Sequence, residues 1–452
     1  MKHKSDQLGT EPIPKMLAKL AIPAMTGTFV MALYNVVAAI FVERTVGTIG
    51  VAAISIAFPI QMIIMAIAGA IGIGGASIIA RMLGANNHDK ANQIFGNVIS
   101  LVLIISLIAA ILGLNFLEPL LYMFGASDTI MPYAKDYMGI ILYGTILFAF
   151  AFSSTNIIRS EGNAKVAMLS MLVSAILNII LTTIFLLVLD WGIKGAAYAT
   201  IIAQGTTVIY IILYFARGKS SLSFNLAYLM PKWSIIKEIV AIGFSAFIHM
   251  SSSSIMMVVA NHMLITFSGD TAVAVLGIVQ RIMMFALMPM MGIVQGLTPL
   301  AGYNYGAGLH DRVTQSIKLS IKTTTIIATI AFVIIMVFPS KLMLIFTSDE
   351  SAIEMGTTAL RIMFAASLTI GLQMVTGSVF QALGRAKSAT VLSMSRQVLF
   401  LIPLLLVLPL IWKLTGVWIA FPVADLLAFF LALWYIHKNR DLFLQAKTSV
   451  TK

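Results

Sequence analysis

The sequence contains no cysteine, and only 10% of its 452 residues are charged. Without cysteine the chain can form no disulfide, no thiolate metal site and no thiol nucleophile. A Walker loop, a His-Glu-x-x-His motif and a Gly-x-Ser-x-Gly motif are also missing, which argues against direct use of ATP and against hydrolytic chemistry. The sequence therefore predicts neither an enzyme nor a protein with a cofactor or a bound metal.

Hydrophobic residues make up 60% of the chain, and the mean hydropathy is +0.98. These values are typical of an integral membrane protein, because a soluble domain needs more polar surface. Apolar runs of about 20 residues, each long enough to cross a bilayer, recur along the whole sequence. They predict an all-α protein with twelve transmembrane helices over residues 15–42, 51–79, 94–116, 132–157, 165–189, 194–216, 236–267, 273–300, 316–340, 355–380, 388–411 and 416–437.

The formal net charge is +12, and the basic residues are distributed unevenly between alternate loops. Twenty Lys and Arg residues fall on one set of connections and ends, and five fall on the other set, namely Arg44, Lys135, Lys194, Lys341 and Lys413. This asymmetry is the positive-inside signal, so we expect both termini in the cytoplasm and the protein in the inner membrane. The basic residues set the orientation of the chain and do not indicate a nucleic-acid partner. The first span opens with charged residues, which is not the pattern of a cleaved signal peptide.

The two halves of the chain carry the same short sequence motifs about 222 residues apart. Gly84-Ala85 returns as Gly306-Ala307, and Gly162 returns as Gly384. An even number of spans in each half predicts two parallel six-helix lobes related by an axis along the membrane normal. We expect an N-terminal lobe over residues 1–217, a flexible cytoplasmic linker over 218–235 and a C-terminal lobe over 236–452. Two such lobes usually enclose one central pathway, which points to a transporter.

Several segments resemble the multidrug and toxic compound extrusion (MATE) family, and the similarity extends over essentially all 452 residues. They are Leu20-Ala21-Ile22-Pro23-Ala24, Tyr34-Asn35, Ile79-Ala80-Arg81-Met82-Leu83-Gly84-Ala85, Arg159-Ser160-Glu161-Gly162-Asn163, Pro299 to Gly308, and Phe421-Pro422-Val423-Ala424-Asp425. The pattern is similar to the proton-linked branch related to the DNA-damage-inducible F proteins. The resemblance implies export of organic cations and other amphipathic compounds, in exchange for protons or sodium, through a cleft between the lobes.

The chain departs from this branch at its proton relay. The resemblance would place an Asp four residues after Tyr34 and another four residues after Asn178, but Ala38 and Thr182 occupy these positions. Neither side chain ionises near neutral pH, so the relay does not carry over. A resemblance to the sodium-linked branch would imply carboxylates deep in helices 7 and 10. Both helices lack them, so a sodium site has no support in the sequence.

The remaining ionisable residues within the spans are candidates for coupling, because buried charge in a membrane is costly. Asp425 lies near the middle of the last span, with Arg396 at a similar depth and Arg281 in the outer half of helix 8. Asp425 and one arginine could form a purely structural bridge, or a proton or a cationic substrate could compete with the arginine for Asp425. Further coupling candidates are Glu43, His249 and His262, each of which could instead be a solvated or locally satisfied side chain.

We therefore predict a secondary active multidrug efflux transporter that exports amphipathic, cationic organic compounds by alternating access, with protons favoured over sodium as the coupling ion. The alternatives are a lipid-linked saccharide flippase and a homologue that binds or senses but no longer transports. We expect a monomer whose partners are the small-molecule substrate, the coupling ion and the lipid bilayer. The predicted pathway residues are Tyr34, Asn35, Asn178, Thr200, Gln204, Gln280, Arg281, Gln295, Gln373 and Asp425.

Overall fold

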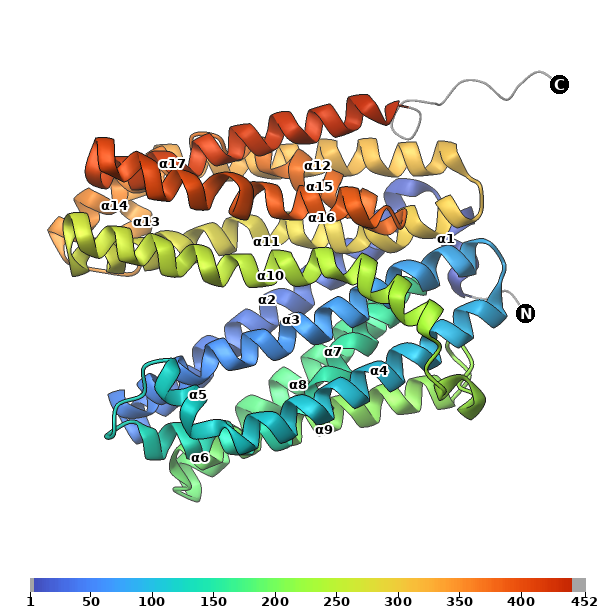
Figure 1. Ribbon diagram of the computed structural model, residues 1–452, viewed down its shortest axis with the longest axis horizontal. Helices are drawn as coiled ribbons and strands as arrows, with labels where there is room; N and C mark the ends of the chain where they lie inside the picture. The colour runs from blue at the N-terminus through green and yellow to red at the C-terminus, as the bar shows by residue number, and fades with distance from the viewer. Residues whose placement is uncertain (1–3, 441–452) are drawn as a thin grey trace.

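The computed structural model describes residues 4–440, which form helices joined by short connections (Figure 1). Two bundles of helices lie side by side. The first lobe contains α2 (Ile13–Val46), α3 (Thr48–Gly84), α4 (His88–Asn115), α5 (Leu117–Met123), α6 (Met131–Tyr143), α7 (Thr145–Ser160), α8 (Ala164–Thr183), the π-helix η2 (Ile184–Val188) and α9 (Gly192–Ala216). Short helices η1 (Lys4–Asp6) and α1 (Gln7–Thr10) precede it, and η3 (Leu226–Leu229) lies in the linker.

The second lobe repeats this order of elements. It contains α10 (Trp233–Ser268), α11 (Asp270–Gly306), α12 (His310–Val337), α13 (Pro339–Leu344), α14 (Glu350–Met363), η4 (Ser367–Thr369), α15 (Ile370–Ala382), α16 (Ala386–Met394), the π-helix η5 (Ser395–Leu401) and α17 (Ile402–Lys438). The prediction of an all-α membrane protein with twelve spans in two six-helix lobes is confirmed.

The count of spans follows from where helices break. Nine described helices are long and apolar enough to cross a bilayer, and two bent pairs, α6 with α7 and α14 with α15, add two more spans. The 53-residue run from Ala386 to Lys438 is too long for one crossing. It is interrupted by non-helical backbone at Trp412 and Lys413, which divides it into the eleventh and twelfth spans.

The sequence repeat is also a repeat of backbone geometry. The fourth span of each lobe is bent, by 55° between α6 and α7 and by 45° between α14 and α15. Gly47 and Gly269, 222 residues apart, both link the first two spans of their lobes with positive φ, at 81° and 75°. An L-residue with a side chain is strained in this conformation, so glycine suits both turns. The shared geometry supports descent of the two lobes from one duplicated unit.

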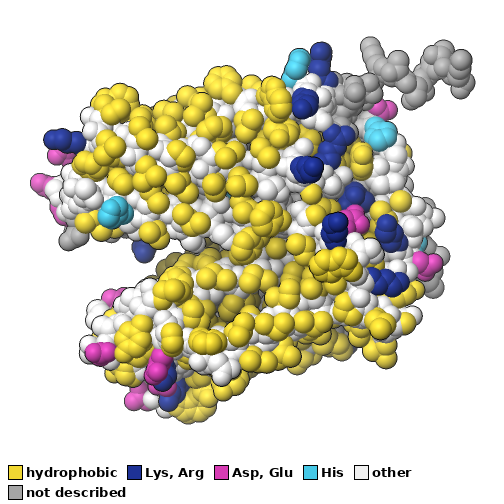
Figure 2. Space-filling model, viewed as in Figure 1, with side chains coloured by type: hydrophobic (Ala, Val, Ile, Leu, Met, Phe, Trp, Pro, Cys, Tyr) yellow, Lys and Arg dark blue, Asp and Glu magenta, His cyan; other side chains and the backbone are white. Residues whose placement is uncertain are grey.

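The lobes meet at one end of the molecule and separate toward the other (Figure 1). Both ends of the described chain lie toward the closed end (Figure 1). Lys and Arg side chains gather on the visible face of this end, and the opposite end is hollowed between the lobes (Figure 2). We call these the basic end and the open end.

Glycines bring the lobes into contact at the basic end. Gly74 of α3 packs on the backbone of Gly243 in α10, and Gly296 of α11 packs on Ala21 in α2. Each residue of the second contact lies 222 positions from its counterpart in the first, so the two contacts are related by the repeat. Small residues at both places let the backbones approach closely.

The linker between the lobes is held against the first lobe, whereas the sequence led us to expect a flexible connection. Backbone groups of Tyr228, Leu229 and Lys232 form hydrogen bonds with side chains of α4. Ser220 and Ser221 donate hydrogen bonds to Glu161 at the end of α7. These contacts fix the linker to one lobe, and relative motion of the lobes must therefore involve α10 beyond Lys232.

Candidate functional site

A hollow opens between the lobes at the open end of the face that Figure 2 shows. Helix α11 lines it. Gly292 of α11 packs against Met25 and Ala21 of α2. Arg281 lies eleven residues away, about three helical turns, and so on the same face of α11. Arg281 is exposed in the structure.

Asp425 and Arg396 form the central ion pair of the second lobe. The Arg396 Nε donates a hydrogen bond to Asp425 Oδ1 at 2.5 Å. The Asp425 side chain is completely buried in α17, while that of Arg396 is 22% exposed. The structure thus selects Arg396, and not Arg281, as the arginine that pairs with this acid.

The ion pair is only partly satisfied. Asp425 Oδ2 and Arg396 Nη2 are buried and form no hydrogen bond with the described residues. Polar groups of charged residues are costly to leave unpaired away from water. Arg396 also belongs to the π-helix η5, and such segments within α-helices are frequent at functional sites. These features distinguish the pair from a well-satisfied structural bridge.

Polar side chains connect the pair to neighbouring helices. Gln373 of α15 donates a hydrogen bond of 2.6 Å to the backbone oxygen of Asp425. Gln397, next to Arg396 in η5, donates one of 2.9 Å to Ser253 of α10. His249, one turn before Ser253, is exposed. Gln397 was not among the predicted residues; its position next to Arg396 in the sequence was the available signal.

A second polar cluster lies in the first lobe. The Asn178 amide of α8 donates a hydrogen bond of 3.2 Å to Thr200 of α9, and Thr182 donates one of 3.3 Å to the Asn178 oxygen. Thr182, which stands where the resemblance implies an acid, is 1% exposed. The structure brings Asn178 and Thr200 together, and it joins them through hydroxyl and amide groups that carry no charge.

The other predicted residues of the first lobe form no hydrogen bond with this cluster in the described part of the chain. Tyr34 is partly buried in α2, and Asn35 beside it is exposed and donates a hydrogen bond to Met31 of its own helix. Gln204 is partly buried in α9. Glu43 is exposed near the outer end of α2, and the described residues include no ion pair between it and Arg44.

Three predicted residues of the second lobe lie outside the Asp425 cluster. Gln280 and Gln295 are partly buried in α11, and each has one buried amide atom without a hydrogen bond among the described residues. His262 is exposed in the outer part of α10, thirteen residues from His249. Hydrogen bonds therefore join the predicted residues into two groups, Asn178 with Thr200 in the first lobe and Gln373 with Asp425 in the second.

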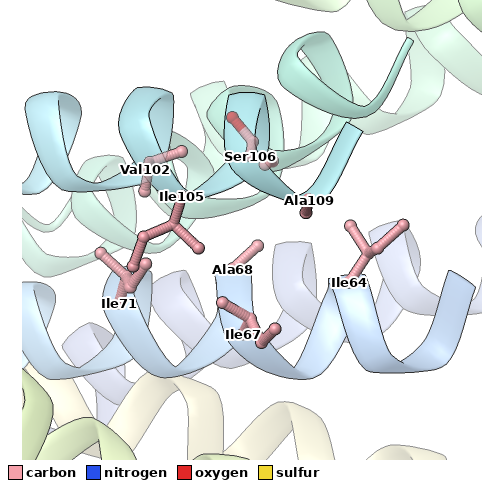
Figure 3. A pocket seen from close by; sticks show the side chains of 9 residues that line it. Ile64, Ile67, Ala68, Ile71, Val102, Ile105, Ser106 and Ala109 are labelled. Carbon is pink, nitrogen blue, oxygen red and sulfur yellow. The ribbon is translucent and has the colours of Figure 1, made fainter. Parts of the chain in front are cut away.

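Two further pockets lie apart from the hollow between the lobes: one is too small for an organic substrate, and the other, of about 380 Å³, lies among charged side chains. One lies between α3, α4 and α7, is lined by apolar side chains such as Ile67 and Val102, and has a volume of about 10 Å³ (Figure 3). That space holds about one water molecule. The other lies beside α5 and α6 and is lined by Glu118, Asp128 and Lys135. The hollow between the lobes remains the candidate pathway.

The basic end is closed by the N-terminal segment, whose role the sequence did not indicate. Leu8 of α1 is completely buried. Its backbone oxygen accepts hydrogen bonds from Asn304 of α11 and from Arg312 of α12, both in the second lobe. Gly162 of the first lobe packs close to the Leu8 side chain. Leu8 therefore contacts both lobes where they meet.

This arrangement defines a class of protein. Two repeated six-helix lobes, closed at the basic end and open at the other, with a separate polar cluster inside each lobe, form the architecture of a secondary transporter. The sequence profile of the MatE family matches residues 23–184 and 241–407, which is most of the chain. The chain belongs to the MatE family of multidrug transporters.

Known proteins agree with this assignment over nearly their whole length. The chain is 28% identical, over 96% of each chain, to the multidrug export protein MepA of Staphylococcus haemolyticus strain JCSC1435. It is 48% identical to the MATE multidrug transporter DinF-BH, solved in complex with rhodamine 6G, with a TM-score of 0.91 over 98% of this chain and 99% of that one. An outward-facing MATE family transporter of the MOP superfamily is 28% identical, with a TM-score of 0.92 over 99% and 100%.

Proposed function

We propose that this multidrug efflux transporter exports amphipathic organic cations in exchange for protons, and that Asp425 is the coupling acid. It acts as a monomer in the cytoplasmic membrane, with the basic end and both termini in the cytoplasm. The lobes are residues 1–217 and 236–452, joined by residues 218–235. No enzymatic step, cofactor or metal ion is part of this proposal.

The observation that carries the proposal is the incomplete Asp425–Arg396 pair. Asp425 is the only Asp or Glu that lies deep within a described span, and the first lobe offers Thr182 and Ala38 at the positions where the resemblance implies acids. A proton on Asp425 removes the negative charge that holds Arg396. Gln373 and Gln397 then transmit the rearrangement to α15 and α10, which both belong to the walls of the second lobe.

The coupling follows from competition for one carboxylate. With the open end outward, a proton enters from outside and binds Asp425, which weakens the attachment of a cationic substrate nearby. With the basic end open, the proton leaves to the cytoplasm and the carboxylate again attracts a cation. Exclusive binding of proton and substrate is the condition for exchange, because a site that held both together would carry them in the same direction.

The substrate class is supported by the chemistry of the hollow. Met284 and Phe285 are exposed on the helix that carries Arg281, and we propose that such apolar side chains contact an amphipathic compound. Methionine adapts its shape readily, and the chain contains 28 of them. The relative DinF-BH was solved with rhodamine 6G, and we propose that the present chain carries similar dyes.

Transport of rhodamine 6G in proteoliposomes tests the function. A proton gradient and a sodium gradient are imposed separately, and dye movement is followed by fluorescence. We expect acceleration by the proton gradient and none by sodium. Acceleration by sodium alone contradicts proton coupling.

The same vesicles separate the alternatives. A flippase is indicated by movement of a lipid-linked saccharide across the bilayer without dye transport. Dye binding without any transport indicates a homologue that has lost coupling. Either result overturns the proposal.

A further inference from the structure

The linker between the lobes has an inner face that docks on α4. Asn97 donates a hydrogen bond of 3.2 Å to the backbone oxygen of Tyr228 and accepts one of 2.6 Å from the backbone amide of Lys232. Ser100 donates one of 2.5 Å to the Leu229 oxygen. Gly96 leaves room for this approach, because a Cβ there would overlap the backbone of Tyr228.

The start of the linker is held on the first lobe by hydrogen bonds to Glu161. Glu161, completely buried at the end of α7, accepts hydrogen bonds from the Ser220 hydroxyl at 2.6 Å and from the Ser221 backbone amide at 2.5 Å. Leu222 follows and is only 4% exposed. The linker is therefore a fixed layer on the first lobe, with one side facing inward and the other facing away from the protein.

The outward side is apolar. Leu226 is 74% exposed, Met230 76% and Trp233 77%, and these are the highest values among the exposed large hydrophobic side chains of the described residues. Phe224 adds a fourth, at 54%. Exposed apolar clusters of this kind mark a contact with another surface.

The position along α4 places this cluster at the edge of a bilayer. Asn97 and Ser100 lie nine and twelve residues after the first residue of α4, about 14 to 18 Å along its axis. The polar first turns, with Asp89 and Lys90, come before them, and the apolar run of the span begins at about residue 94. The linker thus lies beside the level at which α4 enters the hydrocarbon, where tryptophan is characteristically enriched.

The charge of the segment identifies the kind of surface. Residues 217–237 contain four basic side chains, Arg217, Lys219, Lys232 and Lys237, and no Asp or Glu. Lys219, Lys232 and Lys237 are all exposed. Apolar side chains inserted between headgroups, with lysines beside them, are the combination that binds anionic lipid.

We propose that the interlobe linker is a membrane anchor, in which Phe224, Leu226, Met230 and Trp233 insert into the inner-leaflet interface and the surrounding lysines bind anionic headgroups. Trp233 is also the first residue of α10, whose next turns pack on α3 through Gly74. The anchor therefore holds the first lobe and the start of α10 at a fixed depth, and the second lobe moves relative to this point.

The absence of native cysteine allows a direct test with single-cysteine variants. Met230→Cys and Trp233→Cys are each labelled with a nitroxide in the full-length protein, and Lys90→Cys, on an exposed turn at the same end of the molecule, is the matched control. Collision of the label with oxygen, which concentrates in the bilayer, is compared with collision with a water-soluble nickel complex. The measurements use vesicles of phosphatidylcholine with and without phosphatidylglycerol.

We expect the ratio of oxygen to nickel collisions at positions 230 and 233 to exceed that at position 90 by at least about threefold in vesicles that contain phosphatidylglycerol. Lys219→Gln combined with Lys232→Gln and Lys237→Gln should reduce this difference. Labels at 230 and 233 that are as accessible to nickel as the label at 90 overturn the anchor. Equal insertion with and without phosphatidylglycerol overturns the role of anionic headgroups. The measurement does not depend on transport, so it stands or falls independently of the proposed function.

Discussion

At the scale of single residues, Asp425 and Arg396 form an ion pair inside the second lobe. The carboxylate is completely buried, and its nearest cation is held by one hydrogen bond of 2.5 Å. An ion pair of this kind gives little net stability, but removal of one partner leaves the other charge unpaired in a medium of low polarity. This asymmetry yields a prediction for stability that is separate from transport.

Arg396→Met alone should lower the free energy of unfolding by about 3 to 5 kcal/mol, because Asp425 then remains without its cation. The double variant Arg396→Met with Asp425→Asn should recover most of this loss, since the unpaired charge is gone. Thermal unfolding in detergent measures both. Equal destabilisation in the single and double variants would show that the two side chains do not interact.

Glu11, at the start of the first span, gives the pH dependence of the closed end. The pKa of its carboxyl is lower than the ordinary value of 4.5, because Lys19 donates a hydrogen bond to it and Lys15 and Lys19 attract its charge. A lowered pKa means that the carboxylate stabilises the folded arrangement above pH 4.5, and that this contribution is lost as the pH falls through the lowered pKa.

We therefore expect acidification below about pH 4.5 to loosen the N-terminal segment around Glu11, with little effect between about pH 6 and 8. Hydrogen exchange of the backbone amides of residues 7–16 measures this change. In Glu11→Gln the same amides should exchange faster at neutral pH and show no further change on acidification. A wild-type segment whose exchange shows no dependence on acidification, once corrected for the intrinsic rate, contradicts the assignment.

At the scale of elements, α3 and α11 end in glycines that let the lobes close. A Cβ on Gly84 would overlap the backbone oxygen of Tyr303, and a Cβ on Gly306 would overlap that of Arg81. The two glycines are 222 residues apart, and each contacts the helix that carries the other. In the proposed transport cycle the same helices separate when the basic end opens, and these contacts would then belong to one state of the transporter.

Gly306→Ala should shift the protein away from the state that is closed at the basic end. Gly277→Ala is the matched control, because this glycine lies in the same helix with open space around it. Spin labels at Lys90→Cys and Asp311→Cys, on exposed turns of the two lobes, report the separation of the lobes at this end. We expect longer distances for Gly306→Ala and unchanged ones for Gly277→Ala; unchanged distances in both would show that the closed state tolerates the methyl group.

The helices themselves were predictable because length and hydropathy determine spans in a bilayer. All twelve predicted ranges correspond to helices of the structure. The bends within the fourth span of each lobe were not predicted, since residues 143–145 and 364–369 contain no proline that would signal a break. The docking of the linker was also missed, because it depends on Asn97 and Ser100, two polar residues in an otherwise apolar helix of another part of the chain.

At the scale of the whole molecule, the duplication predicted two parallel lobes, and the repeated contacts of Gly74 and Gly296 show how they meet. The sequence also pointed to Asp425, because an acid in the middle of a span is rare. It could not decide between Arg281 and Arg396 as partner, because that choice depends on the rotation of α11 and η5 about their axes. The closure of the basic end by Leu8 depends on contacts between residues about 300 positions apart, which no local pattern reveals.

Proton-coupled export, as proposed, requires that a proton and the exported compound compete for Asp425. Addition of rhodamine 6G to the purified protein in weakly buffered solution, with the pH recorded, tests this most directly. We predict that binding of the dye releases protons from the wild-type protein and that Asp425→Asn, although folded and able to bind dye, releases none. Dye binding without proton release by the wild type, or equal release by Asp425→Asn, would contradict the assignment of Asp425 as the coupling acid.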